Sequence, residues 1–262
     1  ICIGLATNAG SHDGVGVFEE YLGGVSIQKG VCLCAAAGNE AEARHHTGGV
    51  LEPGEKPGQI DLKVGDAAGD VYLAIWNTVA DRLSISVRSP TGELVGRVPA
   101  RPGSAPAADV KLVLETARVQ IEYHFPVEGS GGQLSIIRIL NATPGVWGIQ
   151  LPITGFVPPD VEFLSAVPDG TITSPASAVG VICCGAYDSA GKSLYAKSSR
   201  GPAWDGRILP DLVAPGVGIR GIYPHGPGLM SGTSAAAAVV AGICALLLQW
   251  GVRDGNDPAM GT

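Results

Sequence analysis

Apolar and polar residues follow different patterns at the ends of this chain and in its middle. Residues 1–47 contain the apolar segment Ile1–Ala6, a segment over Val17–Lys29 with apolar residues at helical spacing, and the continuous apolar run Val31–Ala37. Helical spacing predicts an amphipathic helix, whereas continuous short apolar runs are typical of strands buried in a parallel sheet. We therefore expect α/β structure here, with Ile1–Ala6 as a buried strand.

Between residues 48 and 158 the pattern changes to alternation with a period of two. Strands are predicted at Ile60–Val64, Val71–Ile75, Leu83–Val87, Lys111–Leu114, Val119–Tyr123, Leu134–Ile139 and Trp147–Leu151. Turn-forming residues separate them, as at Ser89–Gly92 and Gly129–Gly132. Short alternating strands at this spacing favour an antiparallel β-sandwich or jelly roll. Gly48-Gly49 and Pro158-Pro159 mark its expected borders.

The α/β pattern returns in residues 159–262. Val179–Gly185 is a second buried strand, Leu209–Val213 is a short apolar segment, and Ser234–Trp250 is a strongly predicted alanine-rich helix that Ser231–Thr233 is expected to cap. The predicted organisation is one α/β domain, formed by residues 1–47 and 159–262, interrupted by a β domain at 48–158.

Composition narrows the range of partners. Hydrophobic residues make up 45% of the 262 residues, which is ample for a packed core. A net charge of −7 makes nucleic acid an unexpected partner. The chain has no uninterrupted run of 18 apolar residues, so we expect no membrane span.

The cysteines suggest neither a disulfide framework nor a metal site. Cys32 and Cys34 share one face of a predicted strand, Cys183 and Cys184 are adjacent, and Cys244 lies in the apolar helix. These spacings differ from those of zinc fingers, and no His or Asp accompanies either pair. We expect small buried hydrophobic residues, with no metal and no cofactor.

Two segments carry candidate chemistry. Ser234 lies in the first turn of a hydrophobic helix, where backbone N–H groups and the helix dipole favour developing negative charge, so it could act as a nucleophile. Asn39 follows the buried run Ala35–Gly38, where its side-chain amide could be a second donor to an oxyanion. The alternatives are that Thr233 or Ser234 only caps the helix, and that Asn39 is an ordinary turn residue.

Together these segments resemble the subtilases, the subtilisin-like serine peptidases. The resemblance rests on four segments in the order and spacing of the family: Ala36–Glu40, Ser198–Pro202, Pro210–Gly216 and Gly232–Gly242. The last is similar to the family's nucleophile motif, although Ala238-Val239 replaces its usual Pro-His. The fold implied is a partial subtilisin-like doubly wound parallel sheet, interrupted by the antiparallel β-sandwich.

The resemblance implies roles for individual residues. Ser234 would be the nucleophile, Asn39 would donate to the oxyanion together with the Ser234 backbone N–H, and Thr233 would support this region. Substrate peptide would bind along Gly4, Leu5 and Ala6, with Ala37 and Gly38 forming a wall of the first specificity pocket.

One departure is serious. Subtilases supply their triad in the order Asp, His, Ser. The 38 residues before Asn39 contain neither D-[ST]-G nor H-G-T, and their single histidine, His12, lies in a polar loop where the family has no catalytic residue. Because a serine without a base is a poor nucleophile, we expect this chain to be an inactive fragment of a peptidase whose N-terminal part is its missing partner.

The inserted segment resembles the jelly-roll modules of clostridial and spore-germination subtilases, through Ser89–Glu93 and Pro144–Ile149. The resemblance implies a secreted, spore-associated or cell-envelope protein. Two other functions stay open: a pseudoprotease that binds proteins, and a β-sandwich that binds a ligand on an inert scaffold. An exposed sheet edge at Ile1–Ala6 would also favour dimers.

Overall fold

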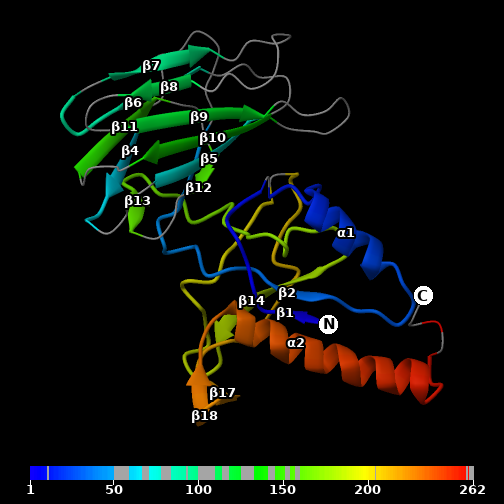
Figure 1. Ribbon diagram of the computed structural model, residues 1–262. Coiled ribbons are helices and arrows are strands. Elements are labelled where there is room, and N and C mark those ends of the chain that lie inside the picture. The colour runs from blue at the N-terminus through cyan, green and yellow to red at the C-terminus, as the bar shows by residue number, and fades with distance from the viewer. Residues whose placement is uncertain are drawn as a thin grey trace. The chain divides into compact units, whose positions relative to one another are not determined.

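The computed structural model divides the chain into two compact units, Ile1–Glu42 with Pro168–Thr262, and Ala43–Val167 (Figure 1). The sequence prediction placed these borders after residues 47 and 158. The structure describes residues 1–49 except 11, 59–66, 71–77, 84–92, 94–99, 110–113, 118–124, 133–140, 145–150, 154–156, 160–257 except 204, and 259.

The first unit is built on a mainly parallel sheet. Its strands are β1 (Cys2–Ile3), β2 (Cys34–Ala36), β14 (Ile182–Asp188), β15 (Ser193–Leu194) and β16 (Leu212–Pro215). β1, β2, β14 and β16 are parallel neighbours in that order, and β15 pairs antiparallel with β14. The two buried parallel strands that the apolar runs predicted are thus confirmed: β2 is shorter than predicted, and β14 has the predicted length but begins three residues later.

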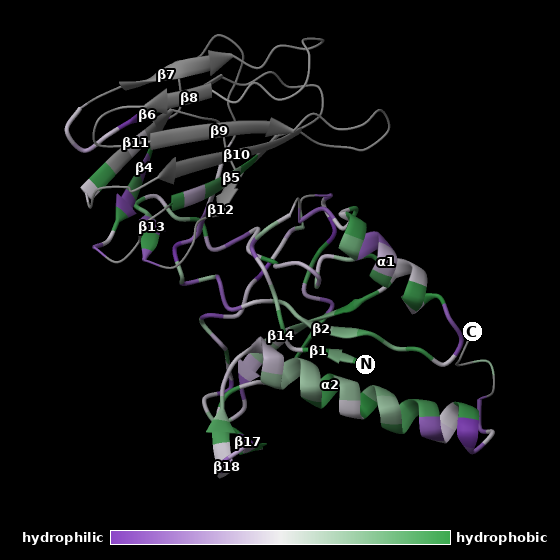
Figure 2. Ribbon diagram, in the orientation of Figure 1, coloured by the Kyte–Doolittle hydropathy of each residue, from purple (hydrophilic) through white to green (hydrophobic). Residues whose placement is uncertain are grey.

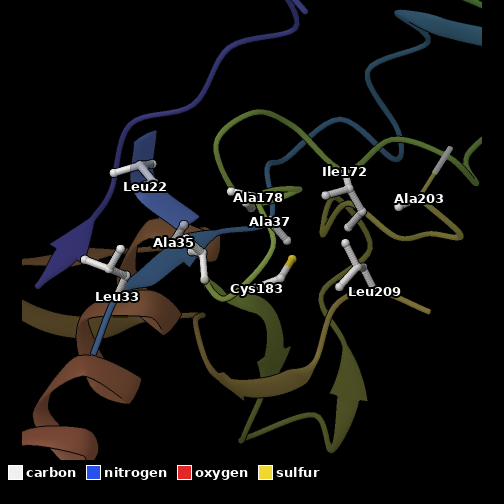
Figure 3. Close-up of a cluster of buried hydrophobic side chains, with 11 residues drawn as sticks. Leu22, Leu33, Ala35, Ala37, Ile172, Ala178, Cys183, Ala203 and Leu209 are labelled. Atoms are coloured by element: carbon white, nitrogen blue, oxygen red, sulfur yellow. The ribbon is translucent and has the colours of Figure 1, made fainter. Parts of the chain in front are cut away.

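Two helices cover opposite faces of this sheet, which explains why β2 is apolar at every position. Figure 3 shows Leu22 of α1 (Val17–Ser26) with Leu33, Ala35, Ala37 and Cys183 on one face. The other face packs against α2 (Thr233–Leu248) through Cys34, Ala36, Cys184, Ala186, Ala214, Ala236, Ala237 and Val240. Successive residues of a strand point to opposite faces, so both sides must be apolar.

The helix predicted at Ser234–Trp250 is confirmed as α2, followed by one π-helical segment, η1 (Gln249–Arg253). The predicted side-chain cap is wrong. The N-cap is Gly232, which has no side chain, and the hydroxyls of Ser231 and Thr233 bond elsewhere, to the N–H of Gly218 and to Gly38 and Asn39.

This helical segment is apolar over most of its length, as Figure 2 shows. Thr233–Arg253 has a mean hydropathy of 2.0, with 28% of its most apolar window buried, and is the one described helix long and apolar enough to cross a membrane. The sequence has no uninterrupted run of 18 apolar residues here because single polar residues and glycines interrupt the segment. Length and composition alone do not separate a membrane span from a core helix of a soluble protein.

The expected buried strand at Ile1–Ala6 is wrong in extent and burial. β1 covers only Cys2–Ile3, and Ile1 and Leu5 are 67% and 83% exposed. The reason is position: β1 is an edge strand with β2 on one side, and the chain leaves the sheet at Gly4.

A short hairpin leads into α2. It consists of β17 (Ile219–Tyr223) and β18 (Gly226–Met230), with His225 exposed in its turn. This hairpin is not predicted from the sequence, because its glycines and prolines weaken the alternation on which strand prediction depends.

The second unit contains two antiparallel sheets, with strand orders β3-β12-β5-β10-β9-β8 and β13-β4-β11-β6-β7. Their bounds are β3 His46–Gly48, β4 Gln59–Val64, β5 Val71–Asn77, β6 Ser84–Arg88, β7 Leu94–Pro99, β8 Val110–Val113, β9 Arg118–His124, β10 Gln133–Leu140, β11 Gly145–Gln150, β12 Thr154–Phe156 and β13 Val161–Phe163. The period-two segments coincide with strands, whereas β3, β7, β12 and β13 were not predicted. Along β5, Val71, Leu73 and Ile75 are buried while Tyr72 is 46% exposed, as expected for a strand whose successive residues point to opposite faces.

Candidate active site

Ser234 is the second residue of α2 and lies where backbone N–H groups of a helix have no helical partner. The Thr233 N–H donates to Asn39 Oδ1 at 3.0 Å, and the two N–H groups after Ser234 both donate to the Gly232 carbonyl. The Ser234 N–H has no hydrogen-bond partner within the described part of the chain. One donor at this helix end, that of Ser234 itself, is therefore left for a ligand.

The Ser234 hydroxyl contacts the segment that follows β1. Its Oγ donates to the Gly4 carbonyl oxygen at 2.8 Å, across 230 positions of sequence. A Cβ atom added to Gly4 would lie 3.6 Å from Ser234 Cβ, an ordinary contact distance. The chain thus passes the serine at van der Waals distance.

The Asn39 side chain is held in one orientation by Thr233. Its Oδ1 accepts the Thr233 N–H and, at 3.3 Å, the Thr233 hydroxyl, whose oxygen accepts the Gly38 N–H at 3.1 Å. A backbone N–H can only donate, so the Asn39 atom facing it must be the carbonyl oxygen. The amide nitrogen Nδ2, which has no hydrogen-bond partner among the described residues, therefore supplies two N–H donors on the other side.

Gly38 is required for this arrangement for two reasons. Its φ of +107° is a backbone conformation that residues other than glycine rarely adopt. An added Cβ would also lie 2.6 Å from Thr173 Cγ2 and 2.7 Å from Ser199 Oγ, closer than van der Waals contact permits. The strand end that carries Asn39 is thus tightly enclosed.

Two residues that the sequence analysis did not assign roles hold this strand end in place. Ser199 Oγ accepts the Glu40 N–H at 3.0 Å, and the Ser199 N–H donates to the Gly38 carbonyl at 2.9 Å. Thr173, also buried, donates its N–H and its hydroxyl to the Ala37 carbonyl, both at 3.0 Å. Ser199 belongs to a segment that resembles the family, but Thr173 carries no such sequence signal.

The segment Pro210–Gly216 positions the start of α2. Asp211 Oδ2 accepts the Cys183 N–H at 2.7 Å, which fixes this segment to β14. The Gly216 carbonyl accepts the Gly232 N–H at 2.7 Å, and a Cβ at Gly216 would lie 2.6 Å from that of Ala186. Only glycine permits this approach, so the residues before α2 depend on Gly216.

The residues predicted to bind substrate fall into two groups. Gly4, Leu5 and Ala6 form an exposed segment that begins at the Ser234 hydroxyl. Ala37 and Gly38 are buried, and their backbone groups already bond to Thr173, Thr233, Ser199 and β14. Any contribution of Ala37 and Gly38 to a pocket would therefore come from shape.

The hydrogen bond of the Ser234 hydroxyl involves neither histidine of this unit. His12 is buried, and its ring nitrogens lie 2.6 Å from the Ile172 carbonyl oxygen and 3.0 Å from that of Asn8. His225 is exposed in the β17–β18 turn. Both nitrogens of His12 are thus within hydrogen-bond distance of backbone oxygens.

Two cavities of about 470 and 460 Å³ lie in the described structure, one in each unit. The first is lined by residues that include Val179, Arg207 and Asp211, the second by residues that include Lys63 and Glu162. Neither is lined by Ser234 or Asn39. The candidate site thus lies outside both cavities. It consists of the Ser234 hydroxyl at the start of α2 and the Asn39 side-chain amide beyond the end of β2.

A serine hydroxyl at a helix N-terminus beside a fixed side-chain amide is an arrangement suited to serine peptidases. The sequence pattern of the subtilase family matches residues 162–256, which include α2 and the segments before it. Over this stretch the chain is similar to the subtilase family.

Two known proteins extend this likeness. Pyrolysin of Pyrococcus furiosus is 48% identical over 61 residues, which are 22% of this chain and 4% of pyrolysin. The structure of the Clostridium perfringens CspB protease superposes with a TM-score of 0.87 at 32% identity, over 97% of this chain and 56% of that one. The chain therefore spans little more than half of the matched structure and a small part of pyrolysin. The likeness confirms the subtilisin-like α/β fold.

Proposed function

We propose that Ser234 is the nucleophile of a subtilisin-like serine endopeptidase and that Asn39 and the Ser234 backbone N–H bind the oxyanion. In the reaction, Ser234 Oγ attacks the carbonyl carbon of a peptide bond and loses its proton to a base. The tetrahedral intermediate carries its negative charge on the former carbonyl oxygen. The amine then departs with a proton, and water releases the acyl group.

The observation that carries this proposal is the pair of donors left without partners. Thr233 uses its N–H and hydroxyl to hold Asn39 Oδ1, so Asn39 Nδ2 is turned away with two N–H groups. The Ser234 N–H is the donor of the first helical turn that no described acceptor satisfies. Fixed donors of this kind stabilise an oxyanion without reorganising during the reaction.

The base and its aspartate would come from polypeptide outside these 262 residues. The Ser234 hydroxyl donates to Gly4 rather than to an imidazole, and both His12 nitrogens face backbone carbonyls. Without a base the hydroxyl stays protonated and reacts slowly. We therefore propose that the chain alone hydrolyses no peptide bonds, and that it becomes competent with the N-terminal part of the catalytic domain.

A fluorophosphonate probe tests the two halves of this proposal separately. The chain alone is expected to label poorly at neutral pH, and stoichiometric labelling of Ser234 would refute the missing base. The gene product extended upstream of Ile1, or this chain mixed with that upstream segment, is expected to label and to cleave peptides. Absence of labelling there, with the D-[ST]-G and H-G-T motifs present upstream, would refute Ser234 as the nucleophile.

Two variants of the extended protein complete the test. Ser234→Ala should abolish labelling with little effect on stability, because the side chain is only partly buried. Asn39→Ala should lower kcat by about 10²–10³, the usual cost of removing one oxyanion donor. If the upstream motifs are replaced and no variant changes any activity, the pseudoprotease alternative is supported instead.

The substrates that fit this proposal are peptides or proteins, bound along the exposed segment Gly4–Ala6. We propose a secreted, spore-associated or cell-envelope location on the basis of the family. Fractionation of the source cells would test it, and recovery with cytosolic markers alone would contradict it.

A further inference from the structure

Three cysteine thiols from two distant segments of the sequence come together where α2 packs on the sheet. Cys34 begins β2, Cys32 lies two residues before it, and Cys244 comes from the second half of α2. The Sγ atoms of Cys32 and Cys34 are 3.9 Å apart, as are those of Cys34 and Cys244, and all three lie within 4.8 Å of one another. The sequence spacing of Cys32 and Cys34 did not predict a metal site, because its third member is 210 residues from Cys34.

These separations match those between thiolates that share one metal ion. A zinc–sulfur bond of about 2.3 Å separates two sulfur atoms by about 3.8 Å in tetrahedral geometry and by about 4.0 Å in trigonal geometry. Two of the three Sγ–Sγ distances fall within this interval. The third pair, Cys32 and Cys244, must approach by less than 1 Å at most, a change that rotation about the Cα–Cβ bonds can supply.

The surroundings select the kind of ion. Cys34 is fully buried among small apolar residues of β2, β14 and α2, such as Ala36, Ala236 and Val240. The ligand set contains no carboxylate and no imidazole. Thiolates in an apolar setting bind soft ions such as Zn²⁺, Cd²⁺ and Cu⁺ in preference to Mg²⁺ or Ca²⁺, which require oxygen ligands.

The protonation of the thiols is consistent with an ion replacing protons. Burial, followed by the nearby Cys32 and Cys244 thiols, raises the pKa of Cys34, and burial is also the main cause that raises the pKa of Cys32. An ion that binds the Cys32 and Cys34 thiolates would therefore displace their protons.

We propose that Cys32, Cys34 and Cys244 form a binding site for a thiophilic d¹⁰ metal ion such as Zn²⁺, with three thiolate ligands. Cys32 and Cys244 are partly exposed, which gives the ion a route of entry and leaves a coordination position for water. The ion would join β2 to α2. These are the elements whose far ends carry Asn39 and Ser234.

Metal titration of the reduced chain tests this site. In the presence of a phosphine reductant, Cd²⁺ should bind with one ion per chain and produce the ultraviolet thiolate-to-cadmium charge-transfer band, and Zn²⁺ should displace it. At an ion concentration 100-fold above Kd, the melting temperature should rise by about 5–10 °C. A chelator should reverse this rise.

The variants separate ligand loss from loss of structure. Cys244→Ala and Cys32→Ser should each weaken Cd²⁺ binding by about 100-fold or more, since even residues behind the ligands typically contribute 10–100-fold. Cys183→Ala is the matched control, because Cys183 is buried on the opposite face of the sheet with Leu33 and Ala35. It should leave affinity unchanged.

Either of two results would overturn the proposal. The first is equal Cd²⁺ affinity and band intensity in Cys244→Ala, Cys32→Ser and the unmodified chain. The second is a failure of the unmodified chain to bind Cd²⁺ or Zn²⁺ at micromolar concentration while its thiols are shown to be reduced. Far-ultraviolet circular dichroism identifies any variant that has not folded, and the Cd²⁺ affinity of the other ligand variant then decides.

Discussion

The hydroxyl of Thr233 provides the sharpest test of how the site is held together. Thr233 is fully buried, and its hydroxyl accepts the Gly38 N–H and donates to Asn39 Oδ1. Thr233→Val keeps the volume and removes the oxygen. The Gly38 N–H then loses its buried acceptor, whereas Asn39 Oδ1 keeps the backbone N–H of residue 233.

The expected loss of stability follows from that one unsatisfied group. A buried donor without a partner costs about 1–3 kcal/mol, so the free energy of unfolding should fall by about 2 kcal/mol. For a chain of this size, that corresponds to a decrease in melting temperature of about 4–8 °C. Scanning calorimetry on the chain measures it directly.

Two further variants make this result interpretable. Thr233→Ser retains the oxygen and should recover most of the loss, leaving only the cost of the missing methyl group. Thr7→Val removes an exposed hydroxyl that accepts the Ala9 N–H, and it should change stability by less than about 0.5 kcal/mol. If Thr233→Val is no more destabilising than Thr7→Val, the hydroxyl does not support the strand end and the reasoning about Asn39 fails.

Two other predictions concern the fold. Gly38→Ala should lower the free energy of unfolding by about 3 kcal/mol or more, because it combines a positive φ with a Cβ contact of 2.6 Å to Thr173; a urea midpoint like that of the unmodified chain would contradict this. We also expect the chain to dimerise through the free side of β1, the edge strand, since an unpaired edge presents N–H and C=O groups to another chain. Light scattering tests this, and a monomer throughout a concentration series would refute it.

The sequence indicated the elements of the first unit because their patterns have physical causes. Val31–Ala37 is apolar at every position, and the structure shows why: alternate residues of β2 face α1 and α2. The same logic failed for Ile1–Ala6. An apolar run does not reveal whether a strand has neighbours on one side or both, and β1 has β2 on one side only.

The site was predictable only in part, because contacts between distant segments produce no repeating pattern in the sequence. Ser234 and Asn39 were identified by their positions at an expected helix start and strand end. Thr173 supports the same strand end through two hydrogen bonds, but a threonine in a loop gives no signal of that kind. The meeting of Cys34 and Cys244 likewise depends on how α2 packs on the sheet.

The β17–β18 hairpin was not predicted, whereas the helices were, because their sequences differ in how many positions carry the expected pattern. Helices and buried strands repeat one pattern over many residues, so several positions report the same structure. The hairpin Ile219–Met230 contains three glycines and two prolines, so few positions report its alternation. Its pairing is set by backbone hydrogen bonds, which sequence composition describes poorly.

The two ends of the Asn39 side-chain amide have different functions: Oδ1 bonds to Thr233 and supports the fold, whereas Nδ2 is the atom available to the site. Both hydrogen bonds from Thr233 to Asn39 end on the side-chain oxygen Oδ1. An aspartate at position 39 would offer the same oxygen to the same donors. The outward nitrogen would become a second oxygen, turning a donor for negative charge into a source of repulsion. Under the proposed function, a single deamidation of Asn39 would therefore silence the site in a protein that remains folded, and aged samples of the extended protein would lose activity before they lose structure.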